Sequence, residues 1–176
     1  ADSYERIGSI NQRLSKYQEA ILYHYKCLQM RLSLCKDDDS LINSCYINIG
    51  SVCIEQKKYE EALHFFQKVS ESIKKKYKYL NPEFASNLNN IAAAYRGLEQ
   101  YESALEYYKK CLKAHQVLFG EDNVIVAIKY TNIGEMYENL QQYEEGLDAL
   151  MNGLYLKIRT LGQQHPSLAS SLFKIG

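Results

Sequence analysis

The sequence predicts an all-α fold, a solenoid made from one helical hairpin copied about four times. An isoleucine followed by glycine or alanine recurs every 42 residues along the 176-residue chain, without insertion or deletion. A tyrosine followed three residues later by a small residue keeps the same period. Repeat arrays bury a core between units and leave long faces open, which suits binding better than catalysis. The markers are Ile7-Gly8, Ile49-Gly50, Ile91-Ala92, Ile133-Gly134 and Ile175-Gly176, with Tyr17, Tyr59, Tyr101 and Tyr143 followed by Ala20, Ala62, Ala104 and Gly146.

Each unit contains two amphipathic segments, which in the second copy are residues 44–56 and 59–77. Counting repeat positions from residues 1, 43, 85 and 127, the apolar or small residues of the first segment fall at positions 4, 7, 8 and 11. At about 100° per residue these positions form one narrow stripe on a helix. In the second segment Ala62, Phe66 and Val69 combine small residues with an aromatic, so the paired helix can approach closely. The two segments therefore predict an antiparallel helical hairpin.

Stop and start signals separate the units. Gly120 and Gly162 stand where a helix C-terminus favours a left-handed residue. Pro82 and Pro166 stand in the first turn of the next helix, where a backbone N–H would have no partner within the helix. Asn81 is the expected N-cap before Pro82. We expect one continuous array that resembles a piece of a longer one, with units at about 1–39, 40–81, 82–123 and 124–165 and the start of a fifth at 166–176.

Charge and composition exclude several classes of partner. Lys plus Arg equals Asp plus Glu at 21 each, which leaves no net attraction to nucleic-acid backbones or anionic membranes. No apolar run approaches the roughly 18 residues that cross a bilayer. We therefore expect a soluble, cytoplasmic protein that binds no nucleic acid and enters no membrane.

Cysteines and histidines show no pattern of a catalytic or metal site. The five cysteines, an odd number without a Cys-x-x-Cys motif, indicate buried packing residues in a reducing compartment. The four histidines occupy unrelated repeat positions, and phosphate-loop and nucleophile motifs are missing. We also expect the run Lys74-Lys75-Lys76 to be solvated at a helix end and the four periodic tyrosines to serve mostly in packing. No catalysis, metal or cofactor is predicted.

The repeat positions named above, with alanine at 20, an aromatic at 24 and a small residue at 27, resemble the tetratricopeptide repeat signature over the whole chain. The usual unit of that family has 34 residues, and the extra eight here lengthen the second helix and its exit by roughly two turns. Units of 42 residues are similar to those of kinesin light chain, as are segments 88–92, 100–105 and 161–166. The resemblance implies a right-handed α-solenoid used in protein interaction.

Four residues depart from that signature. Asn11 and His24 replace aromatic residues, which predicts a weaker or more exposed first unit. Gly146 and Gly153 replace alanine and a small residue in the fourth unit. They permit closer helix packing, although each costs about 1 kcal/mol of helix propensity relative to alanine.

A surface of mostly short residues lies opposite the packing stripe of the first helices, where repeat positions 2, 6, 9 and 13 cluster within about 60°. Asn48, Asn90 and Asn132 form a ladder on it, and each amide can donate to and accept from a peptide backbone. The alternative is that these asparagines brace neighbouring loops. In the family that the chain resembles, first helices line a concave groove and this asparagine position contacts peptides.

The predicted groove residues carry mixed charge, so a strongly acidic ligand is not demanded. That departs from the more basic groove that kinesin light chain uses for acidic, tryptophan-containing peptides. The predicted residues are Arg6, Ser9, Arg13, Ser44, Asn48, Ser51, Asn90, Arg96, Asn132, Glu135 and Lys174.

The sequence thus predicts a non-enzymatic interaction module that holds a peptide segment of a partner protein in its concave groove. One alternative is a structural or oligomerising scaffold element whose ends associate with further repeats. Another is a sensor or regulatory arm of a larger multidomain protein.

Overall fold

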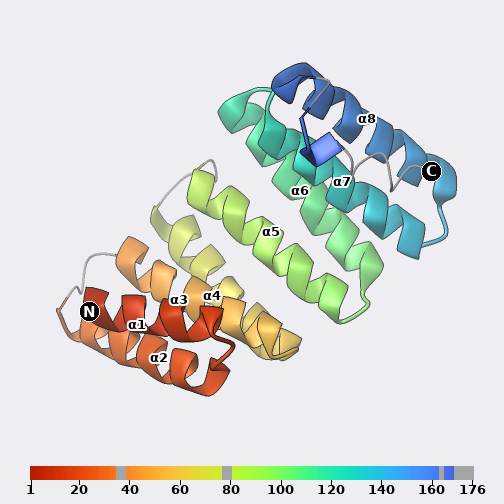
Figure 1. Ribbon diagram of the computed structural model, residues 1–176. Coiled ribbons are helices and arrows are strands. Elements are labelled where there is room, and N and C mark those ends of the chain that lie inside the picture. The colour runs from red at the N-terminus through yellow and green to blue at the C-terminus, as the bar shows by residue number, and fades with distance from the viewer. Residues whose placement is uncertain (35–38, 77–80, 163–164, 169–176) are drawn as a thin grey trace. The chain divides into compact units, whose positions relative to one another are not determined.

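The computed structural model describes residues 1–34, 39–76, 81–162 and 165–168, and within them it contains eight α-helices and no strand (Figure 1). This confirms the predicted all-α class. The helices are α1 (Asp2–Arg13), α2 (Tyr17–Leu34), α3 (Asp39–Glu55), α4 (Tyr59–Lys76), α5 (Pro82–Gly97), α6 (Tyr101–Phe119), α7 (Val124–Asn139) and α8 (Tyr143–Leu161).

The helices belong to two compact units, each of which holds two hairpins. Unit 1 is Ala1–Tyr79 with α1 to α4, and unit 2 is Leu80–Gly176 with α5 to α8. In unit 1, α1 pairs with α2 and α3 with α4, while α2 also packs on α3. Unit 2 repeats this arrangement with α5–α6, α7–α8 and the α6–α7 contact. The predicted hairpins are therefore confirmed.

The periodic glycines are the points at which the two helices of a hairpin approach most closely. A Cβ atom added to Gly50 would lie 2.5 Å from Cε1 of Phe66, and one added to Gly134 would lie 2.7 Å from Cγ of Leu150. Neither position could accept alanine without a shift of the opposing side chain. Gly153, one of the two departures in the fourth repeat, is less tight, but its added Cβ would lie 3.0 Å from the backbone carbonyl oxygen of Ala127.

Helix ends follow the predicted signals with one exception. The Asn81 side chain accepts a hydrogen bond of 2.6 Å from the backbone N–H of Phe84, directly before Pro82. Gly120 and Gly162 end α6 and α8 with φ angles of 82° and 84°, a region open mainly to glycine. Helix α3 begins at Asp39, near the predicted start of the second repeat at about 40 but five residues before the amphipathic segment at 44–56. The additional turn contains Asn43, which is buried, so packing extends the helix beyond the periodic stripe.

The first repeat has exposed apolar residues on α1, but the expected exposure is wrong at His24. His24 is only 1% exposed and lies on Gly8, in the place that Phe66 takes over Gly50 in the second hairpin. Exposure in this unit comes instead from α1, where Ile10 is 57% exposed. The equivalent residue of α3, Val52, is fully buried, and α3 packs on α2 of the preceding hairpin.

The packing role predicted for the periodic tyrosines is wrong at Tyr143, which is 66% exposed. Tyr101, its counterpart in α6, packs against a core cluster that includes Ile133 and Met136 of α7. After α8 only Ser167 and Leu168 are described as helical, and these two residues do not provide the packing surface that α7 gives Tyr101.

Candidate functional site

The predicted groove residues lie on the first helix of each hairpin and form one set in each unit. We call these sets the first-helix faces. The face of unit 1 lies on α1 and α3, which are in contact, and the face of unit 2 lies on α5 and α7. Lys174 is outside the described residues. The unit 1 face contains Arg6, Ser9, Arg13, Ser44, Asn48 and Ser51, and the unit 2 face contains Asn90, Arg96, Asn132 and Glu135.

A hollow of about 460 Å³ covers the α1 part of the unit 1 face. It brings together three predicted residues, Arg6, Ser9 and Arg13, at spacings of three and four that place them on one side of the helix. Ile10 supplies an apolar surface between them. This hollow therefore presents two basic groups, a hydroxyl and an alkyl surface side by side.

Asn48 is already engaged within unit 1. Its Nδ2 donates to Oε1 of Glu5 at 3.0 Å, and this bond links α3 to α1. The same carboxylate receives the Arg31 guanidinium, whose Nη2 lies 2.6 Å from Oε2 of Glu5 and 3.2 Å from Oδ1 of Asp2. Asn48 therefore acts as a brace, as the alternative interpretation held, although it braces a helix and not a loop.

Arg31 is the organising residue that the sequence analysis missed. It is 3% exposed, and its Nη1 donates to the carbonyl oxygen of Leu41 at 3.0 Å and to Oγ of Ser44 at 2.7 Å. Burial lowers the pKa of Arg31, but the hydrogen bond to Glu5, together with the charge of Glu5 and the neighbouring Cys45 and Cys27, raises it above its ordinary value. The sequence did contain a sign of this role. The same repeat position holds polar residues in the third and fourth repeats, His115 and Lys157, and both are buried.

The serines of the unit 1 face bond to their own helices. Ser9 donates to the carbonyl oxygen of Glu5 at 3.0 Å, and Ser51 donates to that of Ile47 at 2.8 Å. These bonds use the hydroxyl protons and keep the side chains close to the helix surface. The serine side chains therefore protrude little from the helix, and their oxygen lone pairs can still accept a hydrogen bond from a ligand.

The asparagines of the unit 2 face are free, unlike Asn48. Asn90 and Asn132 are half-buried, and neither side chain hydrogen-bonds to any residue that the structure describes. Beside them, Nη1 of Arg96 lies 3.4 Å from Oε2 of Glu135, and the arginine side chain is 47% exposed. Such an exposed ion pair contributes little to stability and can open for a ligand.

Metal binding and nucleophilic catalysis each need particular arrangements of side chains. No group of three or more His, Cys, Asp or Glu residues there could hold a metal ion. Cys111 and His115 form a close pair, with Sγ and Nδ1 3.4 Å apart, but both are buried. Burial raises the pKa of the Cys111 thiol to about 11, so it stays protonated and unreactive near neutral pH.

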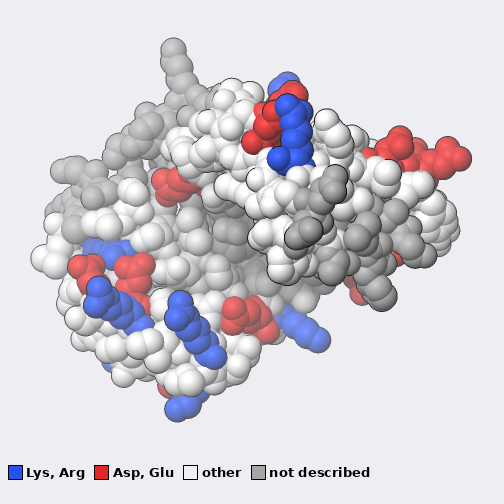
Figure 2. Space-filling model, turned by 45° about the horizontal axis from the view of Figure 1, so that its top comes forward, with Lys and Arg blue, Asp and Glu red and all other residues white. Residues whose placement is uncertain are grey.

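The four described cysteines confirm the packing interpretation. Cys27, Cys45, Cys53 and Cys111 are buried and free of disulfides, while Cys35 is outside the described residues. The face shown in Figure 2 carries basic and acidic groups side by side, and neither sign forms a broad patch there. No helix among the described residues is long and apolar enough to span a membrane.

Comparison with protein families identifies the repeat. A family model described as tetratricopeptide repeat matches residues 1–75 and 83–137, which is most of the chain. The chain belongs to the tetratricopeptide repeat family. A second model with the same description matches residues 126–167. Tetratricopeptide repeats commonly serve in protein–protein interaction.

Solved structures agree on the fold at low sequence identity. BtubC (BKLC) from P. vanneervenii is 20% identical with a TM-score of 0.88, over 99% of this chain and 69% of that one. A putative kinesin light chain from Podosopora anserina, with nearly identical TPR-like repeats, is 15% identical with a TM-score of 0.85, over 99% and 82%. The apo form of RapI is 18% identical with a TM-score of 0.81, over 98% of this chain and 46% of that one. Among curated protein sequences none matches significantly.

Proposed function

We propose that this chain is a non-enzymatic adaptor or scaffold module that binds a peptide segment of a partner protein along its first-helix faces. The observation that carries the proposal is the pair Asn90 and Asn132. Both amides are half-exposed on the unit 2 face and make no hydrogen bond to described residues. A primary amide in that state can donate to and accept from one peptide group of a ligand.

Unit 1 supports the same use with different chemistry. Arg6, Ser9 and Arg13 line one hollow on α1, while Asn48 is held by Glu5. A ligand on this face would therefore contact basic groups and hydroxyl oxygens, because the Asn48 amide is already bonded to Glu5. A related fold has been observed with a ligand, a Rap protein complexed with Competence and Sporulation Factor, which is 16% identical with a TM-score of 0.74.

Peptide selection on the intact chain tests this proposal. Peptides selected from a display library should bind the wild-type chain and lose affinity when Asn90 and Asn132 are both changed to alanine. Each exchanged hydrogen bond contributes on the order of 1 kcal/mol, so the double variant should bind about thirtyfold more weakly if the losses add. Asn48→Ala should weaken binding less, because Asn48 already donates to Glu5.

The matched control removes a charge from a second helix. Lys74 is exposed on α4 and lies outside both first-helix faces. Selected peptides should bind Lys74→Ala as they bind the wild type once salt screens long-range attraction. Peptides that tolerate the double asparagine change but fail on Lys74→Ala would place the functional surface on the second helices and refute the groove.

A second candidate function is end-to-end association of copies in a structural scaffold. Tyr143, Leu147 and Met151 form an exposed apolar stripe on α8, with Leu147 at 48% and Met151 at 50%, and Ile10 is 57% exposed on α1. These side chains occupy four-residue steps along one side of α8. Sedimentation of the wild-type chain and of Leu147→Glu decides the matter. An oligomer in the wild type that dissociates in Leu147→Glu would support association. A wild-type monomer at all concentrations would reject it.

A further inference from the structure

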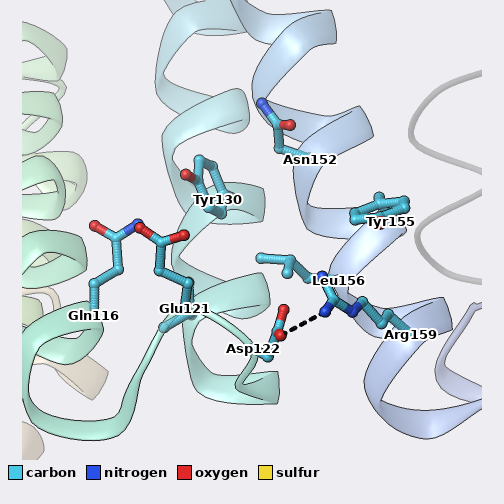
Figure 3. A pocket seen from close by; sticks show the side chains of 9 residues that line it. Gln116, Glu121, Asp122, Tyr130, Asn152, Tyr155, Leu156 and Arg159 are labelled. Atoms are coloured by element: carbon cyan, nitrogen blue, oxygen red, sulfur yellow. Dashed lines mark ion pairs between the residues drawn. The ribbon is translucent and has the colours of Figure 1, made fainter.

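A cavity of about 220 Å³ lies in unit 2, where the end of α6 and the following loop meet α7 and α8 (Figure 3). We call it the α6–α8 cavity. None of its lining residues belongs to the first-helix faces. Its walls combine two tyrosines, two side-chain amides and three charged groups. The lining residues that carry the argument are Glu121, Asp122, Tyr130, Asn152, Tyr155 and Arg159.

The earlier repeats fill the corresponding place with a lysine of their own. In the first repeat Nζ of Lys26 lies between two rings, 6.0 Å from the centroid of Tyr4 and 5.2 Å from that of Tyr23, and in the second Nζ of Lys68 lies 5.4 Å from the centroid of Tyr46. The contacts with Tyr4 and Tyr46 both join repeat position 26 to repeat position 4. These distances lie within the range of a cation–π contact, in which the ammonium is attracted to the negative face of the ring.

The fourth repeat keeps the tyrosine and loses the lysine. Position 4 is Tyr130, but position 26 is Asn152, and both line the cavity. Within the described part of the chain, no cation lies over the Tyr130 ring. Tyr130 is half-buried and Asn152 is exposed, so the ring can be reached from solvent. The third repeat does not provide this arrangement, because Leu88 stands at its position 4.

Charge around the cavity favours a cation from outside. Asp122 and Arg159 neutralise each other, with Oδ2 and Nη2 2.8 Å apart, and this pair holds the guanidinium at the cavity wall (Figure 3). Glu121 adds an exposed carboxylate that is not paired with any described residue. The lining therefore carries a net negative charge, together with amide and phenol oxygens that accept hydrogen bonds.

We propose that the α6–α8 cavity binds the side-chain ammonium group of a lysine presented by a partner polypeptide. The ammonium takes the place over Tyr130 that Lys26 and Lys68 take over Tyr4 and Tyr46 in the earlier repeats. Glu121 supplies the counter-charge, and Asn152 leaves the room that an internal lysine would fill. A partner polypeptide suits the site because its backbone can also hydrogen-bond to the side-chain amides of Gln116 and Asn152, which line the cavity.

The test uses acetyl-Ala-Lys-Ala-amide as the probe and the intact chain with labelled tyrosines, observed by nuclear magnetic resonance. The ring signals of Tyr130, assigned through the variant Tyr130→Leu, should shift in a saturable manner. The same peptide with an acetylated lysine should cause no shift, because acetylation removes the positive charge. Tyr130→Leu, which places at position 4 the residue that the third repeat carries there, should weaken binding about fivefold, the value of an exposed cation–π contact.

Asn152→Lys is the decisive variant, because it restores the lysine of the earlier repeats. It should occupy the cavity from within, shift the Tyr130 signals without any probe and weaken peptide binding at least tenfold. Gln100→Lys adds the same charge to an exposed residue of unit 2 outside the cavity, and it should bind the peptide like the wild type.

Three results would overturn the proposal. Equal binding of the acetylated peptide would show that the positive charge is not recognised. Undiminished binding to Asn152→Lys would show that the peptide lies elsewhere. If butylammonium shifted the Tyr130 signals but the peptide did not, the cavity would accept a free amine, and the assignment to a partner polypeptide would be wrong.

Discussion

The buried cation between two hairpins has carboxylate partners in unit 1 and a neutral amide partner in unit 2. Arg31 is 3% exposed and contacts Glu5 and Asp2 at 2.6 and 3.2 Å. Lys129 is 9% exposed, and its Nζ donates to Oδ1 of Asn89 at 2.7 Å. Burial opposes the charge in both, but the Glu5 hydrogen bond raises the pKa of Arg31, whereas burial lowers the pKa of Lys129. A cation buried between hairpins is therefore stabilised where carboxylates face it and disfavoured where only an amide does.

The units also differ at the side chain that fills each hairpin. In unit 1, His24 is buried, and its two ring nitrogens have no hydrogen-bond partner among the described residues. In unit 2, Tyr108 occupies the same repeat position, is 1% exposed and belongs to a core cluster with Ile133 and Met136. The aromatic brings apolar contact area, while the imidazole brings two unsatisfied polar atoms. Unit 1 therefore contains the weaker hairpin, for a reason other than exposure.

The largest expected effect is Tyr108→Ala, which should cost about 3–5 kcal/mol of unfolding free energy because it leaves a cavity in a packed core. His24→Ala should cost less than half of that. It removes packing too, but it also relieves two buried nitrogens whose desolvation is unfavourable by about 1–3 kcal/mol each. Hydrogen exchange resolved by unit measures both losses, because a repeat array need not unfold in one step.

His24→Phe provides the matched control for this pair. It places at position 24 the residue that the second hairpin uses at Phe66, and it should stabilise unit 1. Equal losses from His24→Ala and Tyr108→Ala, or a destabilised His24→Phe variant, would mean that the imidazole nitrogens are satisfied in solution.

The fold follows from sequence spacing more fully than the site does. The Ile-Gly period locates the stripe of each first helix, and the glycines were expected at close contacts such as Gly134 to Leu150. The polar network was not expected, because Arg31, Glu5 and Asn48 come from three helices and meet only once the hairpins pack. Spacing within one repeat does not show which polar side chains of neighbouring repeats will face each other.

The next effect compares the two buried cations. Arg31→Met should cost about 2 kcal/mol, because it strands the Glu5 carboxylate. The value lies below the 3–5 kcal/mol typical of a broken buried pair, since Glu5 is 29% exposed and Asp2 is 89% exposed. Lys129→Met should be close to neutral or stabilising, because it removes a charge that burial already disfavours. Urea unfolding of the two variants makes the comparison.

The difference in stability between the Arg31 and Lys129 variants depends on the groups that the two cations contact, and not only on the cations. Glu5→Gln removes the carboxylate and leaves Arg31 buried, so it should also destabilise unit 1. A large loss from Lys129→Met, similar to that of Arg31→Met, would mean that the bond from Lys129 to Asn89 fully compensates its burial.

Acidification should weaken unit 1 through His24. Burial lowers the pKa of His24 below its ordinary value of 6.5, and nearby Glu5 offsets only part of this shift. Between pH 6.5 and the lower folded pKa the unfolded chain binds a proton at this residue that the folded unit does not, so stability falls as the pH drops across this window and levels off below it. Tyr108, at the same position in unit 2, does not titrate in this range because burial raises its pKa above 10.0.

Hydrogen exchange of unit 1 at pH 7 and pH 5 measures this loss. In His24→Phe the part of the pH dependence that comes from this residue should disappear. A pH dependence that is unchanged in His24→Phe would assign the acid sensitivity to other groups of the unit.

The smallest expected effect separates bracing from binding along the asparagine ladder. Asn48→Ala should destabilise unit 1 by about 0.5–1 kcal/mol, because it removes the hydrogen bond from α3 to Glu5 on α1. Asn90→Ala and Asn132→Ala should stabilise unit 2 by up to about 0.5 kcal/mol each, because alanine is the better helix former and no described bond is lost. Thermal unfolding of the three single variants shows whether each substitution raises or lowers the stability of its unit. An asparagine that is unfavourable for its helix and bonded to no described residue contributes little to folding, which is compatible with a ligand-binding role. If Asn90→Ala or Asn132→Ala destabilised unit 2 as Asn48→Ala destabilises unit 1, all three asparagines would be braces and the proposed peptide site would lose its main support.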